Sequence, residues 1–469
     1  MQLKSLVSTV VAGILMAGAG AAAESQSSVT VWLTKADRTA VLAKQSTPLT
    51  FTSGNDTGSA IEVNDRRRFQ SMDGFGFALT GGSAQLLMRM DAAQRTAFLQ
   101  ELVGTGDGDL GVSYLRVSIG SSDMNDHAFT YDDLPAGETD PTLAKFSLGP
   151  DSTTVVPVLK EILAIRPDIK ILGSPWSAPA WMKTNDALKD GNLKPEDYPV
   201  YAQYFVKYLT EMQAQGIRID AITVQNEPLN PHNLPSLVMQ PQEEEAFIRD
   251  ALGPALRKAH LRTKIILYDH NCDRPDYPLT ILKDAKAARY VDGSGFHLYG
   301  GEITALTTVH DAFPHKNLYF TEQMVVDRRH DPKLDIAEPE ARLIVGAPRN
   351  WSRNVLLWNL AADPELGPHT DDGGCPVCEG AVTLDGNTVT RNVAWYVVGH
   401  AAKFVPPGSV RIDSSVVEPL PNVAFRTPGG HYVLIVANTS HAAQSFRIRW
   451  HGKSAAATLD DGSVATYVW

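Results

Sequence analysis

Cysteine is scarce in this sequence, and its scarcity limits the chemistry that the chain can carry. Three cysteines among 469 residues cannot form a disulfide framework for a chain of this length. Cys375 and Cys378 form one C-x-x-C pair and Cys272 stands alone, so a structural zinc site would lack two of its ligands. We therefore expect no metal centre, and we expect a local disulfide between Cys375 and Cys378 in an oxidising compartment.

The sequence also lacks an excess of positive charge, long blocks of like charge and stretches of low hydrophobicity. Lys and Arg number 42 against 53 Asp and Glu, which leaves a formal net charge of −11. This balance argues against a nucleic acid or an anionic membrane as the main partner. With 43% hydrophobic residues the composition is globular. Disorder, collagen and coiled coil are set aside, and no obligate protein partner is evident.

Long apolar runs are missing beyond the N-terminus, so no later transmembrane helix is expected. Lys4 is the only charge in residues 1–23, an apolar stretch runs from Leu6 to Met16, and three alanines precede Glu24. These features predict a signal peptide at 1–23, with a single membrane anchor as the alternative. The stretch is diluted by Gly and Ala and is short for a span. We therefore favour cleavage and a secreted or periplasmic protein without a membrane attachment.

The middle of the chain alternates short apolar runs with longer helical patterns, which is typical of βα units and a parallel sheet. Eight such units fit a (β/α)8 TIM barrel. A doubly wound sheet is disfavoured because no G-x-G-x-x-G follows the first strand. The clearest helices are expected at 91–103, 201–215 and 243–260. The predicted strands are Met72–Leu79, Tyr114–Ile119, Ile169–Ser174, Ala221–Glu227, Lys264–Asp269, Gly295–His297, Asn317–Glu322 and Asn354–Asn359.

Both ends of the chain are rich in β-forming residues and differ from the middle. Val, Thr and Leu with Ser, Gly and Asn punctuation fill residues 28–63, and similar short runs recur at Tyr432–Ala437, Gln444–Trp450 and Ala465–Trp469. This pattern predicts one β-sandwich completed by both termini, beside the α/β barrel. The expected domains are N-terminal sandwich strands at 24–68, the catalytic barrel at 69–405 and the C-terminal part of the sandwich at 406–469.

Two glutamates follow apolar runs at predicted strand ends. The fourth strand leads into Gln225-Asn226-Glu227-Pro228, and the seventh ends Thr321-Glu322-Gln323. Active residues of a TIM barrel lie in the loops after its strands, and these two strands face each other across the barrel. A lone glutamate of this kind is usually a solvated rim residue. Two opposite each other predict a catalytic pair, as glycoside cleavage requires.

Aromatic residues lie at the ends of three of the predicted strands. Trp176 and Trp181 come after the third strand, His297 and Tyr299 mark the sixth, and Trp358 closes the eighth. Flat aromatic faces suit the apolar faces of sugar rings. Core packing explains any single tryptophan, but it explains less well the same feature at three strand ends.

Several of these motifs together resemble glycoside hydrolase family 30, which includes lysosomal glucosylceramidases and bacterial β-1,6-glucanases. The motifs are Asn226-Glu227-Pro228, Thr321-Glu322, Ser174-Pro175-Trp176, Trp181-Met182-Lys183-Thr184-Asn185 and Trp358-Asn359-Leu360-Ala361. The likeness runs from about Phe69 to the end of the chain. Asn-Glu-Pro is shared with the wider clan of retaining barrels, whereas the stretch from Ser174 to Asn185 is specific to the family.

The resemblance implies roles for the residues at the strand ends. Glu227 would be the general acid/base, and Asn226 beside it would hold the 2-hydroxyl of the sugar. Glu322 would be the nucleophile that forms a glycosyl-enzyme intermediate. Arg116 would lie near this nucleophile and favour its ionisation, with a purely structural buried ion pair as the alternative.

The resemblance also implies a substrate subsite around these residues. Asp123 matches the family position that binds remote glucose hydroxyls, and Trp176 and Trp358 would line the same subsite. His297 and Tyr299 would lie near the nucleophile and contact substrate. Trp181 would support the site, and no cofactor or metal is implied.

The sequence departs from the animal branch of the family in three places. Leu79-Thr80-Gly81-Gly82 follows the first strand where animal glucosylceramidases carry Thr-Asp-Ala, Met324 replaces a cysteine, and the Cys375–Cys378 segment resembles the bacterial branch. These departures favour a β-glucan over glucosylceramide.

Three functions follow from these observations. A retaining endo-β-1,6-glucanase acting by double displacement is favoured, with an exo-acting β-glucosidase or glucosylceramidase as the alternative. A catalytically inactive carbohydrate-binding barrel is the alternative of another class, but both carboxylates are present. An active enzyme should show a bell-shaped pH profile without metal dependence, because one carboxyl must be ionised and the other protonated.

Overall fold

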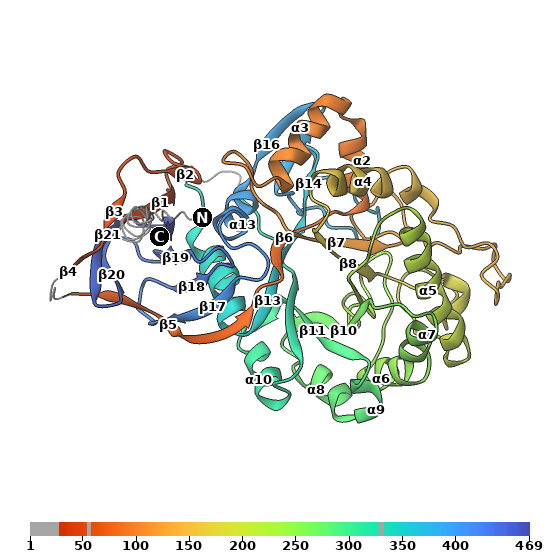
Figure 1. Ribbon diagram of the computed structural model, residues 1–469. Helices are drawn as coiled ribbons and strands as arrows, with labels where there is room; N and C mark the ends of the chain where they lie inside the picture. Colours follow the sequence, from red (N-terminus) through yellow and green to blue (C-terminus); the bar gives the residue numbers. More distant parts are fainter. Residues whose placement is uncertain (1–27, 54–57, 328–332) are drawn as a thin grey trace, which may run out of the picture.

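A closed barrel of parallel strands forms the larger part of the molecule in a computed structural model that describes residues 28–53, 58–327 and 333–469 (Figure 1). Its strands are almost completely buried, as expected where helices cover the outside and side chains fill the inside. The predicted barrel is thus confirmed. In chain order its strands are β6 (Gly74–Ala78), β7 (Tyr114–Ile119), β8 (Lys170–Pro175), β9 (Ala221–Thr223), β10 (Lys264–Cys272), β11 (Val291–Gly301), β12 (Asn317–Glu322) and β13 (Ser352–Asn359).

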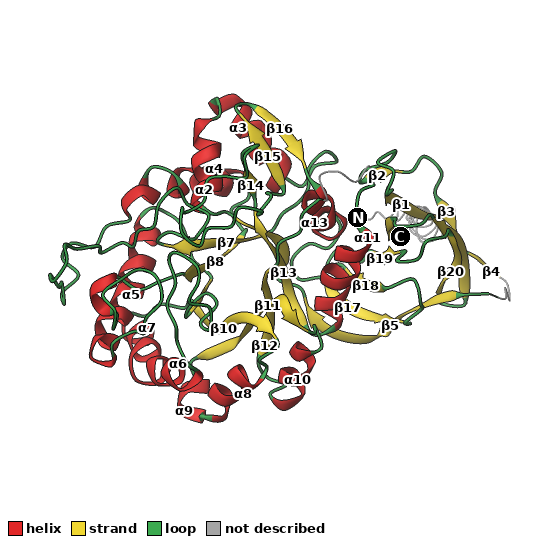
Figure 2. Cartoon of the chain, turned by 180° about the vertical axis from the view of Figure 1, so that it is seen from behind, coloured by secondary structure: helices red, strands yellow, loops and turns green. Residues whose placement is uncertain are grey.

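Helices surround the barrel as an outer ring (Figure 2). Six of the strands contribute side chains to a buried cluster inside the barrel, which includes Tyr114, Ile266 and Tyr319. The barrel is therefore a packed core. The α-helices are α2 (Gly81–Arg89), α3 (Ala92–Val103), α4 (Val155–Ile165), α5 (Tyr198–Ala214), α6 (Pro241–Phe247), α7 (Gly253–Lys258), α8 (Asp276–Lys283), α9 (Ala285–Ala288), α10 (Ala305–Ala312), α11 (Ala337–Pro339), α12 (Gly346–Arg349) and α13 (Val393–Ala402). Shorter helical segments are η1 (Gly149–Ser152), η2 (Ala180–Met182), η3 (Pro195–Asp197), η4 (Ile248–Leu252) and η5 (Glu340–Val345).

Several predicted elements have other bounds in the structure; the strand expected at Gly295–His297, for example, is the longer β11. The helix expected at 243–260 is interrupted by the π-helical segment η4, directly before Gly253 and Pro254. Proline lacks the amide hydrogen that the regular α-helical ladder needs, and the wider turn accommodates this loss. The strand expected at Ala221–Glu227 ends at Thr223, so Glu227 lies in the following loop.

The sandwich lies beside the barrel and is built from both ends of the chain (Figures 1 and 2). Its sheet contains eleven strands within the described residues, and β22 pairs on one side with β1 and on the other with β19. The prediction that N-terminal strands complete the sandwich is confirmed. Its strands are β1 (Ser28–Thr34), β2 (Ala43–Lys44), β3 (Leu49–Thr50), β4 (Thr52–Ser53), β5 (Ala60–Ser71), β17 (Val410–Ser414), β18 (Asn422–Arg426), β19 (Tyr432–Ala437), β20 (Gln444–Trp450), β21 (Lys453–Leu459) and β22 (Val464–Val468). A separate small sheet holds β14 (Ala361–Ala362), β15 (Val382–Asp385) and β16 (Thr388–Arg391).

The N-terminal segment 1–23 lies outside the described residues, so the signal peptide stays a prediction from sequence. Across the ranges that the structure describes, no helix combines the length and hydrophobicity needed to cross a membrane.

His400 of α13 joins the barrel to the sandwich. Its side chain is fully buried, with Nδ1 2.9 Å from Oγ1 of Thr466 in β22 and Nε2 2.8 Å from Oγ1 of Thr34 in β1. Burial lowers the pKa of His400 to about 3, since the charged imidazolium would lose its hydration at this interface.

This histidine is expected to make the protein acid-sensitive. Its pKa in the folded state lies below the value of about 6.5 in the unfolded chain. The unfolded state therefore binds the extra proton as the pH falls through 6.5, and stability is lost by about 1.4 kcal/mol per pH unit until about pH 3. The native protein loses free energy of unfolding between pH 7 and pH 4.5. Replacing His400 with Gln, which cannot ionise, should make this loss smaller by about 2 to 3 kcal/mol. Urea unfolding of the native protein and of the variant at pH 7 and 4.5 measures the two losses of stability. Equal losses in the two proteins would contradict the role of His400.

Candidate active site

A cavity of about 590 Å³ opens at the C-terminal ends of the barrel strands. This is the end of a TIM barrel where the loops bring side chains from different strands together, and the volume suits a small ligand such as one or a few sugar rings. The lining residues are Asp123, Trp176, Asn226, Glu227, Leu229, Asn230, Pro231, His232, Asn233, His270, Asn271, Asp273, Arg274, Tyr299, Glu322, Met324, Trp358, Cys375 and Cys378.

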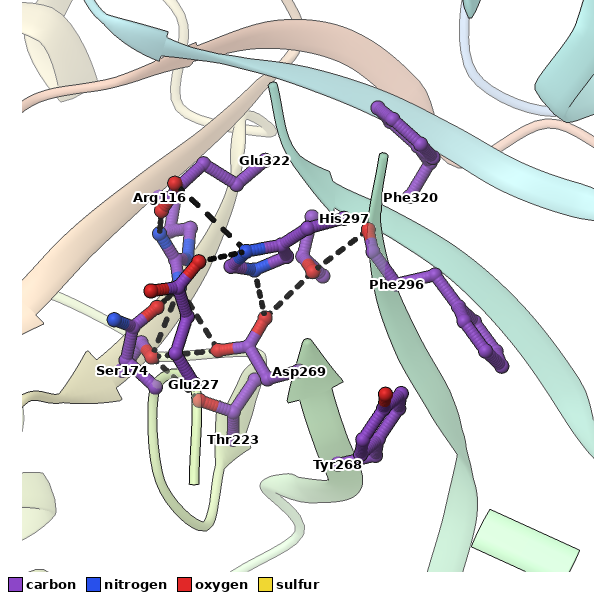
Figure 3. Close-up of polar contacts among 12 residues, drawn as sticks. Arg116, Ser174, Thr223, Glu227, Tyr268, Asp269, Phe296, His297, Phe320 and Glu322 are labelled. Carbon is purple, nitrogen blue, oxygen red and sulfur yellow. Dashed lines mark hydrogen bonds and ion pairs between the residues drawn. The ribbon is translucent and has the colours of Figure 1, made fainter. Parts of the chain in front are cut away.

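Glu227 and Glu322 lie close together in this cavity (Figure 3). One carboxylate oxygen of each glutamate and a ring nitrogen of His297 all lie within 4.8 Å of one another. Glu322 ends β12, whereas Glu227 follows the end of β9 in a left-handed conformation with φ 46°. Two contacts hold this uncommon conformation: the Glu227 amide donates to the Asp269 carbonyl at 3.0 Å, and Asn230 Nδ2 donates to Glu227 Oε2 at 2.7 Å.

Arg116 lies under the carboxylate pair with its side chain fully buried. Its guanidinium donates to Glu322 Oε2 at 2.5 Å and to Asp269 Oδ2 at 2.8 Å (Figure 3). It also donates to Asn226 Oδ1 at 2.6 Å. It also lies 4.8 Å from the ring centroid of Trp176. A buried cation needs such partners, because it has lost its hydration. Arg116 thereby connects strands β7, β10 and β12 and places a positive charge beside Glu322.

His297 differs from its predicted place in the substrate pocket. It is fully buried and uses both ring nitrogens on carboxylates (Figure 3). Nδ1 is 3.1 Å from Glu227 Oε1 and 3.8 Å from Glu322 Oε1, and Nε2 is 3.1 Å from Asp269 Oδ1. His297 therefore contacts the carboxylate pair from behind and leaves no ring nitrogen for a sugar hydroxyl.

This network shifts the pKa values of its members. Burial opposes ionisation of Glu227, but the hydrogen bond and the charge of His297 outweigh it and lower the pKa of Glu227 to about 2. Burial also opposes protonation of His297, yet Glu322, Asp269 and Glu227 raise its pKa to about 9. Burial raises the pKa of Glu322, and the positive charges of His297 and Arg116 counteract that rise. A proton in this arrangement resides on His297 and points at Glu227.

Tyr299 and Asp123 lie at the wall of the cavity. The Tyr299 hydroxyl donates to Glu322 Oε1 at 3.0 Å, while its side chain stays 43% exposed. Asp123 is buried, and this burial together with Glu322 and Glu227 raises its pKa to about 8. A protonated Asp123 could donate a hydrogen bond to a ligand as well as accept one.

The two tryptophans Trp176 and Trp358 line the cavity and stack on each other with ring centroids 5.4 Å apart. Trp181 does not belong to this wall. It is buried, and its Nε1 donates to the backbone carbonyl of Asp132 at 3.1 Å. The predicted support from Trp181 is thus limited to packing of the loop after β8.

Sequence reasoning missed the polar residues at the end of β10 and directly after it. Asp269 connects Arg116 and His297, and His270, Asn271, Asp273 and Arg274 line the cavity. The signal was present, since Asp269-His270-Asn271 ends an apolar run in the same way as the two glutamate motifs do. Asp269 has a positive φ of 59°, which is uncommon and marks a functional position more often than a regular strand.

The same side chains are the ones that could bind a cation. Within the described residues, Glu227, His297 and Glu322 form the single group of three His, Cys, Asp or Glu side chains close enough to share a metal ion. Arg116 already pairs with this group and supplies its positive charge. We therefore interpret the group as a carboxylate and imidazole network for proton and bond chemistry.

A barrel that holds two buried carboxylates at its mouth, with aromatic rings beside them, defines a glycoside hydrolase by fold and site. Comparison with known proteins identifies the family. Residues 72–405 match the glycosyl hydrolase family 30 TIM-barrel domain, and residues 408–467 match the glycosyl hydrolase family 30 beta sandwich domain. The chain belongs to glycosyl hydrolase family 30, as the motifs predicted.

Individual relatives cover most of the chain. An endo-1,6-beta-D-glucanase of Neurospora crassa is 36% identical over 81% of this chain and 80% of its own length. The lysosomal acid glucosylceramidase of Mus musculus is 28% identical over 88% of this chain and 84% of its own. Among solved structures, the endo-beta1,6-glucanase BT3312 superposes with a TM-score of 0.86 at 34% identity, covering 94% of this chain and 99% of its own.

Proposed function

We propose that this glycoside hydrolase cleaves the β-1,6 bonds of a β-glucan from within the chain and retains the anomeric configuration. One observation carries the proposal: oxygens of Glu227 and Glu322 lie within 4.8 Å of each other. A retaining enzyme has its carboxyl groups about 5–5.5 Å apart so that one attacks directly, whereas an inverting enzyme leaves about 6.5–9.5 Å for a water molecule. The separation here corresponds to the shorter, retaining arrangement.

Glu322 is the nucleophile in this proposal. Its carboxylate is fixed from two sides, by the Arg116 guanidinium on Oε2 and by the Tyr299 hydroxyl on Oε1. The positive charge of Arg116 favours the ionised form that must attack the anomeric carbon. The attack breaks the glycosidic bond and leaves a sugar ester on Glu322, which water then hydrolyses.

Glu227 is the general acid/base, and His297 supplies its proton. The pKa of Glu227 is lowered, whereas a general acid that acts alone needs a raised pKa to keep its proton. The proton on His297 Nδ1 lies one hydrogen bond away, 3.1 Å from Glu227 Oε1. Transfer along this bond makes Glu227 neutral, so that it can protonate the leaving oxygen. In the second step the Glu227 carboxylate takes a proton from the attacking water.

Replacing His297 with Gln should therefore shift the alkaline limb of the pH profile of kcat/KM. In the native enzyme this limb reports loss of the proton that Glu227 and His297 share, and the pKa of His297 is about 9. In the variant the proton can reside on Glu227 alone, whose pKa as a buried carboxyl is lower than that of the pair. The limb should move toward acid by at least about one pH unit. His310→Gln, on the outer helix α10, serves as the control and should leave the profile in place.

The substrate assignment rests on the relatives. Endo-1,6-β-glucanases from three fungi match the chain at 33–36% identity, whereas the glucosylceramidases match at 27–30%. The polar and aromatic lining of the cavity, with Asp123, Asn226 and the stacked tryptophans, suits a neutral sugar. An exo-acting β-glucosidase or glucosylceramidase is the second candidate, because the same centre would also serve a terminal glucoside.

Incubation with β-1,6-glucan separates the candidates. The expected first products are oligosaccharides of mixed length, observed as the β-anomer before mutarotation by nuclear magnetic resonance. Release of glucose alone from the start would favour the exo-acting enzyme, and a first product in the α-configuration would overturn the retaining mechanism. Absence of hydrolysis of every β-glucan and aryl β-glucoside would favour a carbohydrate-binding barrel.

A further inference from the structure

The segment of residues 363–381, which we call the strap, connects β14 to β15 of the small sheet and contributes Cys375 and Cys378 to the lining of the cavity. It forms hydrogen bonds with the loops after two barrel strands. The Thr370 amide donates to the Asp123 carbonyl after β7 at 2.9 Å, and Thr370 Oγ1 donates to the Leu234 carbonyl after β9 at 2.9 Å. The strap thus connects the loops after β7 and β9.

Two further contacts extend this connection. Lys189, in the loop after β8, pairs with Asp372 at 2.6 Å. The Asp327 amide, after β12, donates to Glu379 Oε2 at 3.0 Å. Gly373 packs so closely on the His232 carbonyl that a Cβ atom would lie 2.2 Å from that oxygen, and its φ of 77° is left-handed. The strap therefore has one tightly defined position against the loop after β9.

The disulfide between Cys375 and Cys378 forms the part of the strap that faces the cavity. Cys378 Sγ is 3.4 Å from the Met324 sulfur, just after the proposed nucleophile Glu322. Both sulfurs belong to one apolar cluster with Trp176 and Trp358. Between the two cysteines, Val377 remains 58% exposed at the rim. The wall beside the catalytic pair is thus made of sulfur and indole, which suits the apolar face of a sugar ring.

A disulfide across so few residues contributes little to global stability, because it closes a short loop. Its physical effect is local: it holds the Pro376-Val377 turn compact and keeps both sulfurs on the cavity wall. As two thiols, the side chains would be free to take separate rotamers, and the turn could open toward solvent.

We propose that the disulfide-closed strap is the wall of a sugar subsite adjoining the catalytic pair, and that it selects extended β-glucan chains over small glucosides. The inference rests on the proposed glucanase function and adds the element that sets its preference for chain length. A small aryl glucoside occupies the catalytic subsite and makes few contacts with the wall. A longer glucan places a second glucose against the sulfur and indole surface.

The test compares kcat/KM for a β-1,6-linked glucose tetramer with kcat/KM for an aryl β-glucoside. In the double variant Cys375→Ser/Cys378→Ser, the ratio of the two values should fall about tenfold, which corresponds to about 1.4 kcal/mol of lost binding in the transition state. Gly373→Ala keeps both cysteines but displaces the strap, and it should lower the ratio in the same direction. Cys272→Ala, at the buried free thiol, is the matched control and should keep the ratio of the native enzyme.

Reduction of the native enzyme with a water-soluble phosphine gives an independent reading that needs no variant. The phosphine donates two electrons and takes up an oxygen from water, and the disulfide becomes two thiols. The ratio should fall as in the double variant, and the phosphine should leave the double variant unaffected. An unchanged ratio in the reduced enzyme and in Gly373→Ala would overturn the proposal. A native enzyme that hydrolyses neither substrate would instead overturn the proposed function.

Discussion

Replacing Glu322 with glutamine is expected to lower the turnover of β-1,6-glucan and of an aryl β-glucoside by about 10⁴-fold or more. The amide keeps the shape of the carboxylate, and its single oxygen can accept a hydrogen bond from either Arg116 or Tyr299, but the amide cannot form the ester with the anomeric carbon. Initial rates with both substrates measure the loss. Turnover within about tenfold of the native enzyme would remove Glu322 as the nucleophile.

Glu340→Gln is the matched control for this variant. Glu340 is also a fully buried glutamate, but it lies in η5, which packs against β18 and β19 of the sandwich. Its replacement should leave turnover close to that of the native enzyme. A further variant, Glu322→Gly, opens space for an external nucleophile, and azide should restore activity with formation of an α-glucosyl azide. A β-azide would assign Glu322 to the other role.

Replacing Glu227 with alanine should affect the two substrates differently. Cleavage of β-1,6-glucan should fall by about 10³-fold, because the leaving sugar alcohol needs a proton in the transition state. An aryl glucoside with an acidic phenol needs little assistance in the first step. Its second step should become slow, because no general base activates the water. A burst of phenol followed by slow turnover is therefore expected in rapid-mixing experiments.

Azide again checks the assignment. In Glu227→Ala it should attack the glycosyl-enzyme without needing a general base, speed up the slow phase and give a β-glucosyl azide. Equal losses on glucan and on the activated aryl glucoside, without a burst, would contradict the acid/base role of Glu227. Asn230→Ala keeps the carboxyl but removes the hydrogen bond at 2.7 Å, and it serves as a milder comparison.

The architecture was predictable because the barrel repeats one physical pattern. The strands Tyr114–Ile119 and Asn317–Glu322 were predicted with the bounds that the structure has, since each is a short apolar run buried on both faces. Both glutamates could be identified because barrel chemistry collects where strands end. The same reasoning located the sandwich in both termini, where the β-forming residues are.

The directions of individual side chains could not be predicted with the same success. His297 was expected near the nucleophile and among the residues that contact the sugar, and it lies behind the carboxylates. Trp181 was expected to support the site, and its indole packs into the loop after β8. Asp269 escaped notice although it binds Arg116 and His297. Glu227 and Asp269 have backbone conformations with positive φ, which are imposed by tertiary contacts and leave no periodicity in the sequence.

The pairing of β1 with β22 has a consequence for the order in which the protein is made. β1 is the first described strand to leave the ribosome and β22 the last, and β22 lies between β1 and β19 in the sheet. The barrel can collect its neighbouring βα units while the chain grows, and β1 can pair early with β2 and β3, but its pairing with β22 must wait through the synthesis of the whole barrel. Contacts between such distant segments form slowly, because a long loop must close first. Completion of the sandwich is therefore a late event, and the apolar face of β1 remains exposed until then.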